Sequence, residues 1–419
     1  LVPGIAKGAR FIAAGEAHSV AVSRAGLLYT WGAGSYGRLG HGVSQDFAAP
    51  HAVATLTNVR SAACGVFHTM VVTQDGGLWS FGGGSYGQLG LGGGRGSESG
   101  KNARAVLLPQ EVQRHVRSFR GYTVREVACG DFHTICIADN RDLGAGSHVL
   151  VWGFAVFGRL GLSGEAAAVR RQRVRSGGTS DKEHAGGSGG AAGSRSAKQQ
   201  RPTRTEASES LEASSKAIVV NKPTPLESLQ LGVIVVPTDD QEAAEAAQQQ
   251  QQDQELAPHV QHNMHWSSAR TVVRQIACGA RHSAAVTMDG RLFMWGSNDH
   301  GQLGDGMSKV QQKTLLPTEC RNRAELLRSF VAQVACGEDY TIVLNDGACV
   351  FSFGRASEKQ LGVARAEACH DEPIPVILLG GLDIVALEAG ETHAAALTRD
   401  GALWTWGSIR HGKLGRAKT

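Results

Sequence analysis

The chain has 419 residues, 42% of them hydrophobic, and a formal net charge of +4. Its length allows a large core, and its 55 glycines with few long apolar runs suit an all-β repeat protein. No stretch of about twenty apolar residues occurs, so we expect no membrane span, and the charge is too small to indicate nucleic-acid binding by itself.

The first notable stretch is WGAGSYGRLG at residues 31–40, which contains the spacing G-x-G-x-x-G of a dinucleotide-binding loop. Such a loop should open a helix. The residues after Gly37 instead include further turn formers and show no apolar face with a helical period. Nearly the same words return at residues 81–90 as FGGGSYGQLG. This recurrence favours a structural repeat over a cofactor site.

Six copies of one pattern follow each other along the chain. Each copy opens with a small residue and glycine, continues through a short apolar strand, an Asp-Gly-type turn and a strand ending in an aromatic and glycine, and closes with Leu-Gly. The opening words are AAGEAHS (13–19), AACGVFHT (62–69), VACGDFHT (127–134), IACGARHS (276–283), VACGEDYT (334–341) and LEAGETHA (387–394). The closing glycines are Gly40, Gly90, Gly161, Gly304, Gly362 and Gly415.

These patterns predict a β-propeller. Short alternating runs separated by Asp-Gly turns are antiparallel strands in hairpins. A sheet this small cannot bury its own faces, so repeats of about 50 residues must stack, and radial stacking gives blades around a channel. The aromatics before the blade glycines should be packed between neighbouring blades. They are Trp31, Phe81, Trp152, Trp295, Phe353 and Trp406.

The words ACGxxHT, DGxLWxWG and GQLG, in that order, resemble those of the regulator of chromosome condensation family of seven-bladed β-propellers. The resemblance covers roughly residues 1–163 and 266–419. It implies an all-β propeller with six recognisable blades. We expect repeats one to three in residues 1–163, an insertion at 164–268, and repeats four to six in 269–419.

The insertion is largely low-complexity, with GGTSDKEHAGGSGGAAGSRSAKQQ and a QQQQQ run, so we expect it to be disordered. One island, residues 217–232, contains PTPLESL and is predicted to be the outer strand of the fourth repeat. A degenerate seventh blade within 164–265 is the competing interpretation. The basic cluster formed by Arg170, Arg171, Arg173 and Arg175 is either a nuclear-import or nucleic-acid patch, for example for chromatin, or a solvated linker.

We expect no metal or cofactor. Cys64, Cys129, Cys278 and Cys336 share one slot in successive repeats, which indicates free thiols in a reducing, intracellular compartment, with cytoplasm and nucleus both open. The repeat histidines are too far apart to share one ion, and each is expected to anchor its own turn through a backbone hydrogen bond. These histidines are His18, His68, His133, His282 and His393.

No catalytic group is expected either. GSIRHGKLG at 407–415 has the spacing of a phosphate-binding loop, but Leu414 stands where Ser or Thr would hold magnesium, so this hypothesis is rejected. No Ser–His–Asp or Cys–His grouping exceeds what the repeats place by accident. A hydrolase is therefore not expected.

Two activities of the family can be compared with these residues. The plant ultraviolet-B photoreceptor carries tryptophans in the Gly-x-x-His word, and this chain has none there. The family's prototype is a nucleotide exchange factor for the small GTPase Ran, with acidic residues in two successive words. Asp131 matches the first, the next copy has Arg281 instead, and Asp339 has the right slot one blade too far on.

We therefore predict a protein-binding module, a scaffold or regulatory subunit, that docks a partner on one loop face. The candidate partner-binding residues are Glu16, Asp131, Phe132, Arg281, Glu338, Asp339 and Glu391. The acids among them either attract a basic partner or merely solvate their loops. The alternative function is guanine nucleotide exchange on a Ran-like GTPase.

Closure of the ring has two interpretations. Either six blades close directly, or the chain is a fragment and a missing seventh repeat leaves a gap with two apolar blade faces. We favour the fragment, because Leu1 is not a start and the family has seven blades. Val2-Pro3-Gly4-Ile5 is interpreted as the remnant of an outer strand.

Overall fold

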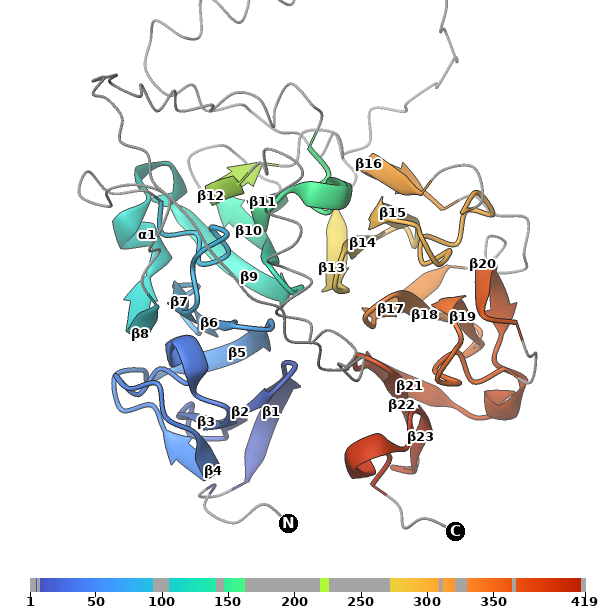
Figure 1. Ribbon diagram of the computed structural model, residues 1–419, viewed down its shortest axis with the longest axis horizontal. Coiled ribbons are helices and arrows are strands. Elements are labelled where there is room, and N and C mark those ends of the chain that lie inside the picture. The colour runs from blue at the N-terminus through green and yellow to red at the C-terminus, as the bar shows by residue number, and fades with distance from the viewer. Residues whose placement is uncertain are drawn as a thin grey trace, which may run out of the picture.

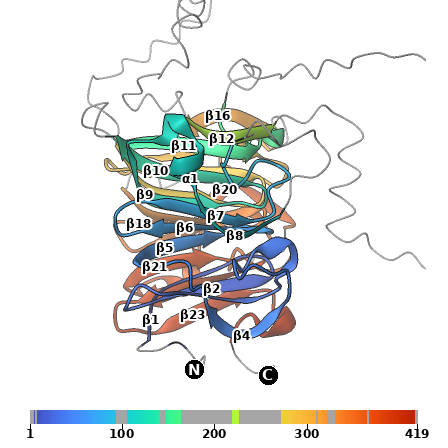
Figure 2. The ribbon, with the colours of Figure 1, turned by 90° about the vertical axis from the view of Figure 1, so that its left-hand side faces the viewer.

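The computed structural model describes residues 5, 8–92, 105–140, 147–162, 219–225, 272–308, 312–320, 330–363 and 367–415. Within this part of the chain, six antiparallel sheets are arranged around a central axis as the blades of a propeller (Figure 1). Figure 2 shows the same blades edge-on, with both ends of the chain on one side of the ring. The predicted all-β propeller with six recognisable blades is confirmed.

Each blade is built from consecutive strands, with the first strand innermost. Blade 1 contains β1 (Ala9–Ala14), β2 (His18–Ser23), β3 (Leu28–Gly32) and β4 (Phe47–Ala52). Blade 2 contains β5 (Val59–Cys64), β6 (His68–Thr73), β7 (Leu78–Gly82) and β8 (Val106–Glu111). Blade 3 contains β9 (Tyr122–Cys129), β10 (His133–Asn140), β11 (Ser147–Phe154) and β12 (Val219–Pro225).

The second half of the ring repeats this order. Blade 4 contains β13 (Val273–Cys278), β14 (His282–Thr287), β15 (Leu292–Ser297) and β16 (Lys313–Glu319). Blade 5 contains β17 (Val331–Cys336), β18 (Tyr340–Asn345), β19 (Val350–Arg355) and β20 (Cys369–Pro375). Blade 6 has three described strands, β21 (Ile384–Ala389), β22 (His393–Thr398) and β23 (Leu403–Gly407).

Helical structure is confined to single turns. They are α1 (Val112–His115) and the 3₁₀ turns η1 (Ser35–Gly37), η2 (Arg117–Phe119), η3 (Val156–Gly158), η6 (Ile377–Leu379) and η7 (Arg410–Gly412).

The hairpin turns form where the Asp-Gly words predict them. Thr73 donates its hydroxyl proton to the Asp75 carboxylate at 2.5 Å, and Gly76 follows with φ of +82°. Thr287 and Asp289 repeat this contact, as do Thr398 and Asp400. Glycine is needed after the aspartate because an L side chain is strained at positive φ.

The cores lie between blades, which is why one blade cannot fold alone. One cluster joins Met70 and Leu78 of blade 2 to Val124, Val127 and Trp152 of blade 3. The second strands are buried along their whole length, as in HTMVVT of β6, because a neighbouring blade covers each face. Phe81, Trp152, Trp295 and Phe353 are fully buried at these interfaces, as predicted.

The other two interblade aromatics, Trp31 and Trp406, are only half-buried. The reason lies in the ring. Successive blades meet through the second strand of one and the first strand of the next, from β2 with β5 to β18 with β21. Among the described strands, β22 and β1 form no comparable pair, and blades 1 and 6 flank an opening where the two chain ends lie (Figure 1).

The strand island of the insertion belongs to a different blade from the one predicted. Residues 219–225 form β12, which pairs with β11 in the third sheet, for example Leu150 with Pro225. The outer-strand prediction is therefore right in kind but wrong in assigning it to the fourth repeat. The outer strand follows the closing turn in sequence, so it completes the blade before it. The rest of the insertion, including Arg170, Arg171, Arg173 and Arg175, lies outside the described residues, as do Val2, Pro3 and Gly4.

Candidate functional site

The candidate partner-binding residues lie at one end of the blades. In each sheet the Gly-x-x-His loop joins the first strand to the second, and the closing turn follows the third strand. His18 pairs with Gly32, and His133 pairs with Gly153. Both turns therefore open onto the same face of the propeller, which we call the loop face.

The first variable residue of each Gly-x-x-His loop lines a central cavity of about 910 Å³. These residues are Glu16, Val66, Asp131, Ala280, Glu338 and Glu391. Backbone bonds join neighbouring loops here, since the Ala280 N–H donates to the Glu338 carbonyl at 3.1 Å and the Glu338 N–H to the Glu391 carbonyl at 3.2 Å. The structure thus brings four of the acidic candidates together around one cavity.

The repeat histidines bond to the next blade rather than to their own turn, so the predicted backbone anchor is wrong. The imidazole Nε2 atoms of His18, His68, His133 and His282 lie 2.9–3.0 Å from hydroxyls of the following blade. The partners are Thr69, Thr134, Ser283 and Thr341. Each hydroxyl in turn donates to a closing-turn carbonyl of the histidine's own blade, as Thr134 does to Gln88 at 2.9 Å. We call this unit the interblade clamp.

The clamp fixes the protonation state of the imidazole. Because the hydroxyl proton is given to the carbonyl, the hydroxyl oxygen must accept a proton from Nε2. Burial holds the pKa of His18 and His68 at about 3 and that of His282 at about 4, and it holds the pKa of His133 well below its usual range. The ring is therefore neutral, and its Nδ1 atom has no hydrogen-bond partner in the described structure.

The aromatics between the blades complete the clamp. Trp152 Nε1 donates to the Gln88 carbonyl at 2.9 Å, and Trp295 Nε1 donates to the Arg159 carbonyl at 3.0 Å. The conserved words of the repeat follow from this packing. A Cβ on Gly130 would lie 2.0 Å from His133 Cε1, and one on Gly90 would lie 2.8 Å from Trp152 Nε1. Both positions therefore exclude larger residues.

The residue before Leu-Gly decides how the closing turn is built. In blade 2, Gln88 Oε1 accepts a bond from the Tyr86 N–H at 2.9 Å. Arginine has no acceptor, and Arg38 Nε donates instead to the Ser35 carbonyl at 3.0 Å, which belongs to the corresponding peptide unit. The peptide is flipped, and the following Tyr36 has φ of +62°. Arg159 and Phe157 repeat this arrangement, with φ of +65° at Phe157.

The two arginines also connect blades. Arg38 donates to the Val66 carbonyl of blade 2 at 2.7 Å, and Arg159 to the Ala280 carbonyl of blade 4 at 3.4 Å. Burial lowers the pKa of Arg159 to about 10, and the Asp131 carboxylate opposes that shift. Both guanidinium groups remain charged at neutral pH.

The second variable residue of each loop reaches the closing turn of the preceding blade. Phe67 contacts Tyr36 with ring centroids 4.9 Å apart, and Phe132 contacts Tyr86 at the same distance. Arg281 lies over the Phe157 ring at 5.4 Å. With Phe154, which is 4.8 Å from Tyr86, these rings form a continuous band across blades 1–3. We call it the aromatic arc, consisting of Tyr36, Phe67, Tyr86, Phe132, Phe154 and Phe157.

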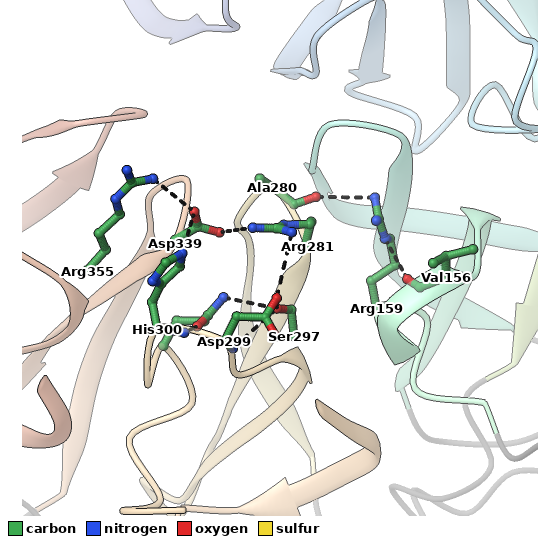
Figure 3. A network of polar contacts seen from close by, with 10 residues as sticks. Val156, Arg159, Ala280, Arg281, Ser297, Asp299, His300, Asp339 and Arg355 are labelled. Atoms are coloured by element: carbon green, nitrogen blue, oxygen red, sulfur yellow. Dashed lines mark hydrogen bonds and ion pairs between the residues drawn. The ribbon is translucent and has the colours of Figure 1, made fainter. Parts of the chain in front are cut away.

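On blades 4 and 5 the same positions carry charges (Figure 3). The Asp339 carboxylate lies 3.1 Å from Arg281 Nη2, 3.6 Å from Arg355 Nη1 and 3.7 Å from His300 Nε2. Arg281 also lies 3.7 Å from Asp299. Asp339 is only 2% exposed, so this candidate holds two half-exposed arginines in place and presents little surface of its own.

The thiols of Cys64, Cys129, Cys278 and Cys336 also line the cavity and are free, as predicted. Burial raises the pKa of each, so they are protonated and unreactive. Among the described residues, no group of three His, Cys, Asp or Glu side chains is placed to hold a metal ion.

Sequence reasoning missed most of the arc and both clamp arginines. Tyr36, Tyr86, Phe154 and Phe157 were treated as turn residues, and Arg355 was not noticed. A signal was present, because the residue before Leu-Gly alternates between arginine and glutamine and an aromatic stands two residues before it in the first three copies.

Comparisons with known proteins agree with this architecture. The family described as "Regulator of chromosome condensation (RCC1) repeat" matches residues 25–72, 75–137, 289–344 and 348–397, and a second description of the repeat matches 10–38, 59–88, 273–302 and 384–412. Together these segments cover more than half of the chain.

Curated relatives match different shares of the chain. The E3 ubiquitin-protein ligase HERC2 of Homo sapiens is 37% identical over 145 residues, which are 34% of this chain and 3% of that protein. The Ultraviolet-B receptor UVR8 of Arabidopsis thaliana is 29% identical over 356 residues, 85% of this chain and 67% of the receptor. The chain thus spans a small part of the ligase.

Solved structures share the fold. Human WBSCR16 aligns with a TM-score of 0.64 and 20% identity, covering 98% of this chain and 79% of that one. Prp20p from Saccharomyces cerevisiae, whose structure is described with its binding to Gsp1p and histones, gives 0.59 and 18%, covering 93% and 68%. The helical turns described here are all too short and polar to cross a bilayer. The repeated clamps and the family matches together show that the chain belongs to the regulator of chromosome condensation repeat family.

Proposed function

We propose that the protein is a binding module that docks a protein partner on its loop face. The observation that carries this proposal is the division of that face. Blades 1–3 offer the half-buried aromatic arc, and blades 4 and 5 offer Arg281 and Arg355 oriented by the buried Asp339. Aromatic residues and arginine are enriched in protein interfaces and dominate their binding energy when they are pre-positioned.

The backbone supports a functional role for the arc. Tyr36 and Phe157 hold positive φ angles, which cost non-glycine residues roughly 1–2 kcal/mol each. Such strain is characteristic of binding sites whose surroundings fix the conformation. Here the clamp arginines impose it, and the result is a rigid aromatic surface.

The acidic residues around the cavity have a secondary role in this proposal. Glu16 and Asp131 interact electrostatically with Arg38 and Arg159, and Lys413 Nζ lies 3.9 Å from the Glu391 carboxylate. Their negative charge is therefore partly balanced. They contribute orientation and steering of a partner with basic groups, while Phe132 and Arg281 contribute most of the affinity.

The test is a quantitative pull-down with the full chain as bait. We expect Phe132→Ala combined with Arg281→Ala to reduce recovery of the wild-type partners by roughly 30-fold, the effect of losing one strong interface contact of about 2 kcal/mol. The matched control is Phe330→Ala with Arg399→Ala, which removes the same residue types from the opposite face.

Equal recovery with the loop-face variant and the control variant would contradict the proposal. The acidic residues are tested in the same assay by Asp131→Arg with Glu338→Arg, at low and high salt. A steering role predicts a loss that is largest at low salt.

The second candidate is guanine nucleotide exchange on a Ran-like GTPase. The observation that favours it is Asp131, which occupies the acidic position of the GDFH word and lines the cavity on the loop face. Exchange would require tighter binding of the nucleotide-free GTPase than of the loaded one. We expect micromolar propeller to accelerate release of a fluorescent guanine nucleotide, and Asp131→Asn to abolish the acceleration. No acceleration across a panel of small GTPases would exclude this function.

A further inference from the structure

The opening between blades 1 and 6 is bordered by two walls that differ from every other blade surface. On blade 1, Ile12 is 73% exposed and β1 alternates between exposed and half-buried residues. On blade 6, Leu403 is 68% exposed and Leu397 38%. The central cavity of about 910 Å³ extends into this sector, because Ile12, Ser19 and Trp31 of one wall and His393 and Lys413 of the other line it.

The blade 6 wall carries one half of an interblade clamp. His393 occupies the position of the four clamp histidines, and its Nδ1 atom is buried without a partner, but among the described residues no hydroxyl of another blade bonds its ring. Lys413 stands where Arg38 and Arg159 reach the next blade. Its ammonium group instead contacts Thr392 of its own blade at 3.1 Å.

The blade 1 wall carries the complementary half. Ser19 occupies the hydroxyl position filled by Thr69 and Ser283 in other blades, and Trp31 occupies the position of Trp152 and Trp295. These groups require an incoming histidine and an incoming closing-turn carbonyl, respectively.

A second type of link is also half-formed on this wall. The Gln275 amide bonds to both the N–H and the carbonyl of Val334 in the next blade, at 3.0 and 3.1 Å, and Gln333 does the same to Leu387. The equivalent residue on blade 1 is Ile12. Its backbone groups lie on β1 at the edge of the opening and can accept such a glutamine.

We propose that the opening is a docking site for one further β-blade of this same repeat type. The walls specify its chemistry. The blade presents a Ser or Thr hydroxyl to His393, a histidine to Ser19, a closing-turn carbonyl to Trp31 and a glutamine on its innermost strand to Ile12. The interfaces between the six blades show that these groups suffice to join two blades.

An intact second copy does not fit this site. If its first blade entered the opening, its second blade would follow into the space that blade 1 of the first copy occupies. The occupant is therefore a single blade. Glu388 marks one difference in what it must offer, because the other blades have alanine at this position, as in Ala128 and Ala277, packed against the following blade.

The test extends the full chain by one repeat in phase. A copy of residues 41–90 is joined after Gly415. It supplies the sequence of β4 as a fourth strand for blade 6 and the sequences of β5–β7 and their closing turn for the opening. We expect the melting temperature to rise by roughly 5 °C or more, and binding of the dye ANS, which reports exposed apolar surface, to fall.

The matched control is an extension with residues 363–415, whose clamp position is Ala394 and lacks the hydroxyl that His393 needs. It should stabilise the chain less, and Ala394→Ser within the extension should restore part of the difference. Within the 41–90 extension, Thr69→Val should remove part of the gain.

Two results would overturn the proposal. One is unchanged dye binding and melting temperature with both extensions, each shown to be intact by mass spectrometry. The other is a dimer of the 419-residue chain, seen by sedimentation, that Ile12→Asp dissociates, since a second copy would then cover the walls.

Discussion

Acidification is expected to unfold the ring well before its carboxylates are protonated. The clamp histidines are neutral when folded, with pKa values held at about 3 for His18 and His68 and about 4 for His282, against 6.5 for the free side chain. The unfolded chain therefore binds more protons below about pH 6.5, and stability is lost as the pH falls from there towards pH 4. Each of these buried histidines contributes about 1.4 kcal/mol per pH unit.

One buried acid opposes this trend. Burial raises the pKa of Glu126 to about 7, so the folded state binds a proton there that the unfolded state releases above about pH 4.5. Its contribution increases on acidification and offsets about one histidine. With four clamps against one such carboxyl, the net effect between pH 6.5 and pH 4.5 remains a loss of stability.

Urea unfolding at a series of pH values measures this slope. His282→Gln keeps an N–H donor for Thr341 but does not titrate, so the variant should lose about one proton from the pH dependence. The control, His115→Gln, changes an exposed histidine and should leave the slope unchanged. An unaltered slope in the His282 variant would show that the clamp imidazoles are not held neutral.

The largest effect of a single substitution is expected at the interface between blades 3 and 4. Trp295 is fully buried, packs in the cluster with Ile135 and Leu160, and donates to the Arg159 carbonyl. Trp295→Ala leaves a large cavity and an unpaired carbonyl lone pair, so we expect a loss of about 3–5 kcal/mol. Denaturant unfolding followed by circular dichroism measures the free energy of unfolding without relying on tryptophan fluorescence.

The chain itself supplies the control for this experiment. Phe81 and Phe353 occupy the same position in blades 2 and 5, where they are fully buried. Trp295→Phe should therefore keep most of the packing and lose mainly the hydrogen bond, at a cost of about 1 kcal/mol. Equal losses in the two variants would mean that packing of this ring does not hold the blades together.

The strands, hairpin turns and interblade aromatics were predictable because each is encoded within one repeat. Thr-x-Asp-Gly specifies its turn locally, and alternation along β6 or β14 specifies a strand. The aromatic word before each blade glycine marks the buried ring. Six in-register copies then made the propeller the only arrangement that buries all of these faces.

The functions of individual side chains were harder to predict because they depend on the neighbouring blade. The histidine word is local, but its partner, such as Ser283 for His133, comes from the next repeat. Asp339 resembles a surface acid in sequence and is buried only because His300 and Arg281 of blade 4 lie against it. The outer strand of residues 219–225 was assigned to the wrong blade because the repeat in sequence and the blade in space are offset by one strand.

The opening in the ring also gives the fold a direction of unravelling. Blades 2–5 each have two neighbours, whereas blades 1 and 6 have one. In an array held by nearest-neighbour contacts, the terminal units open locally at lower free energy than the interior ones. Backbone amides of β10 and β14 should therefore exchange their hydrogens most slowly, and those of β2 and β22 fastest among the second strands. A gapless ring would have no ends and would protect all blades alike.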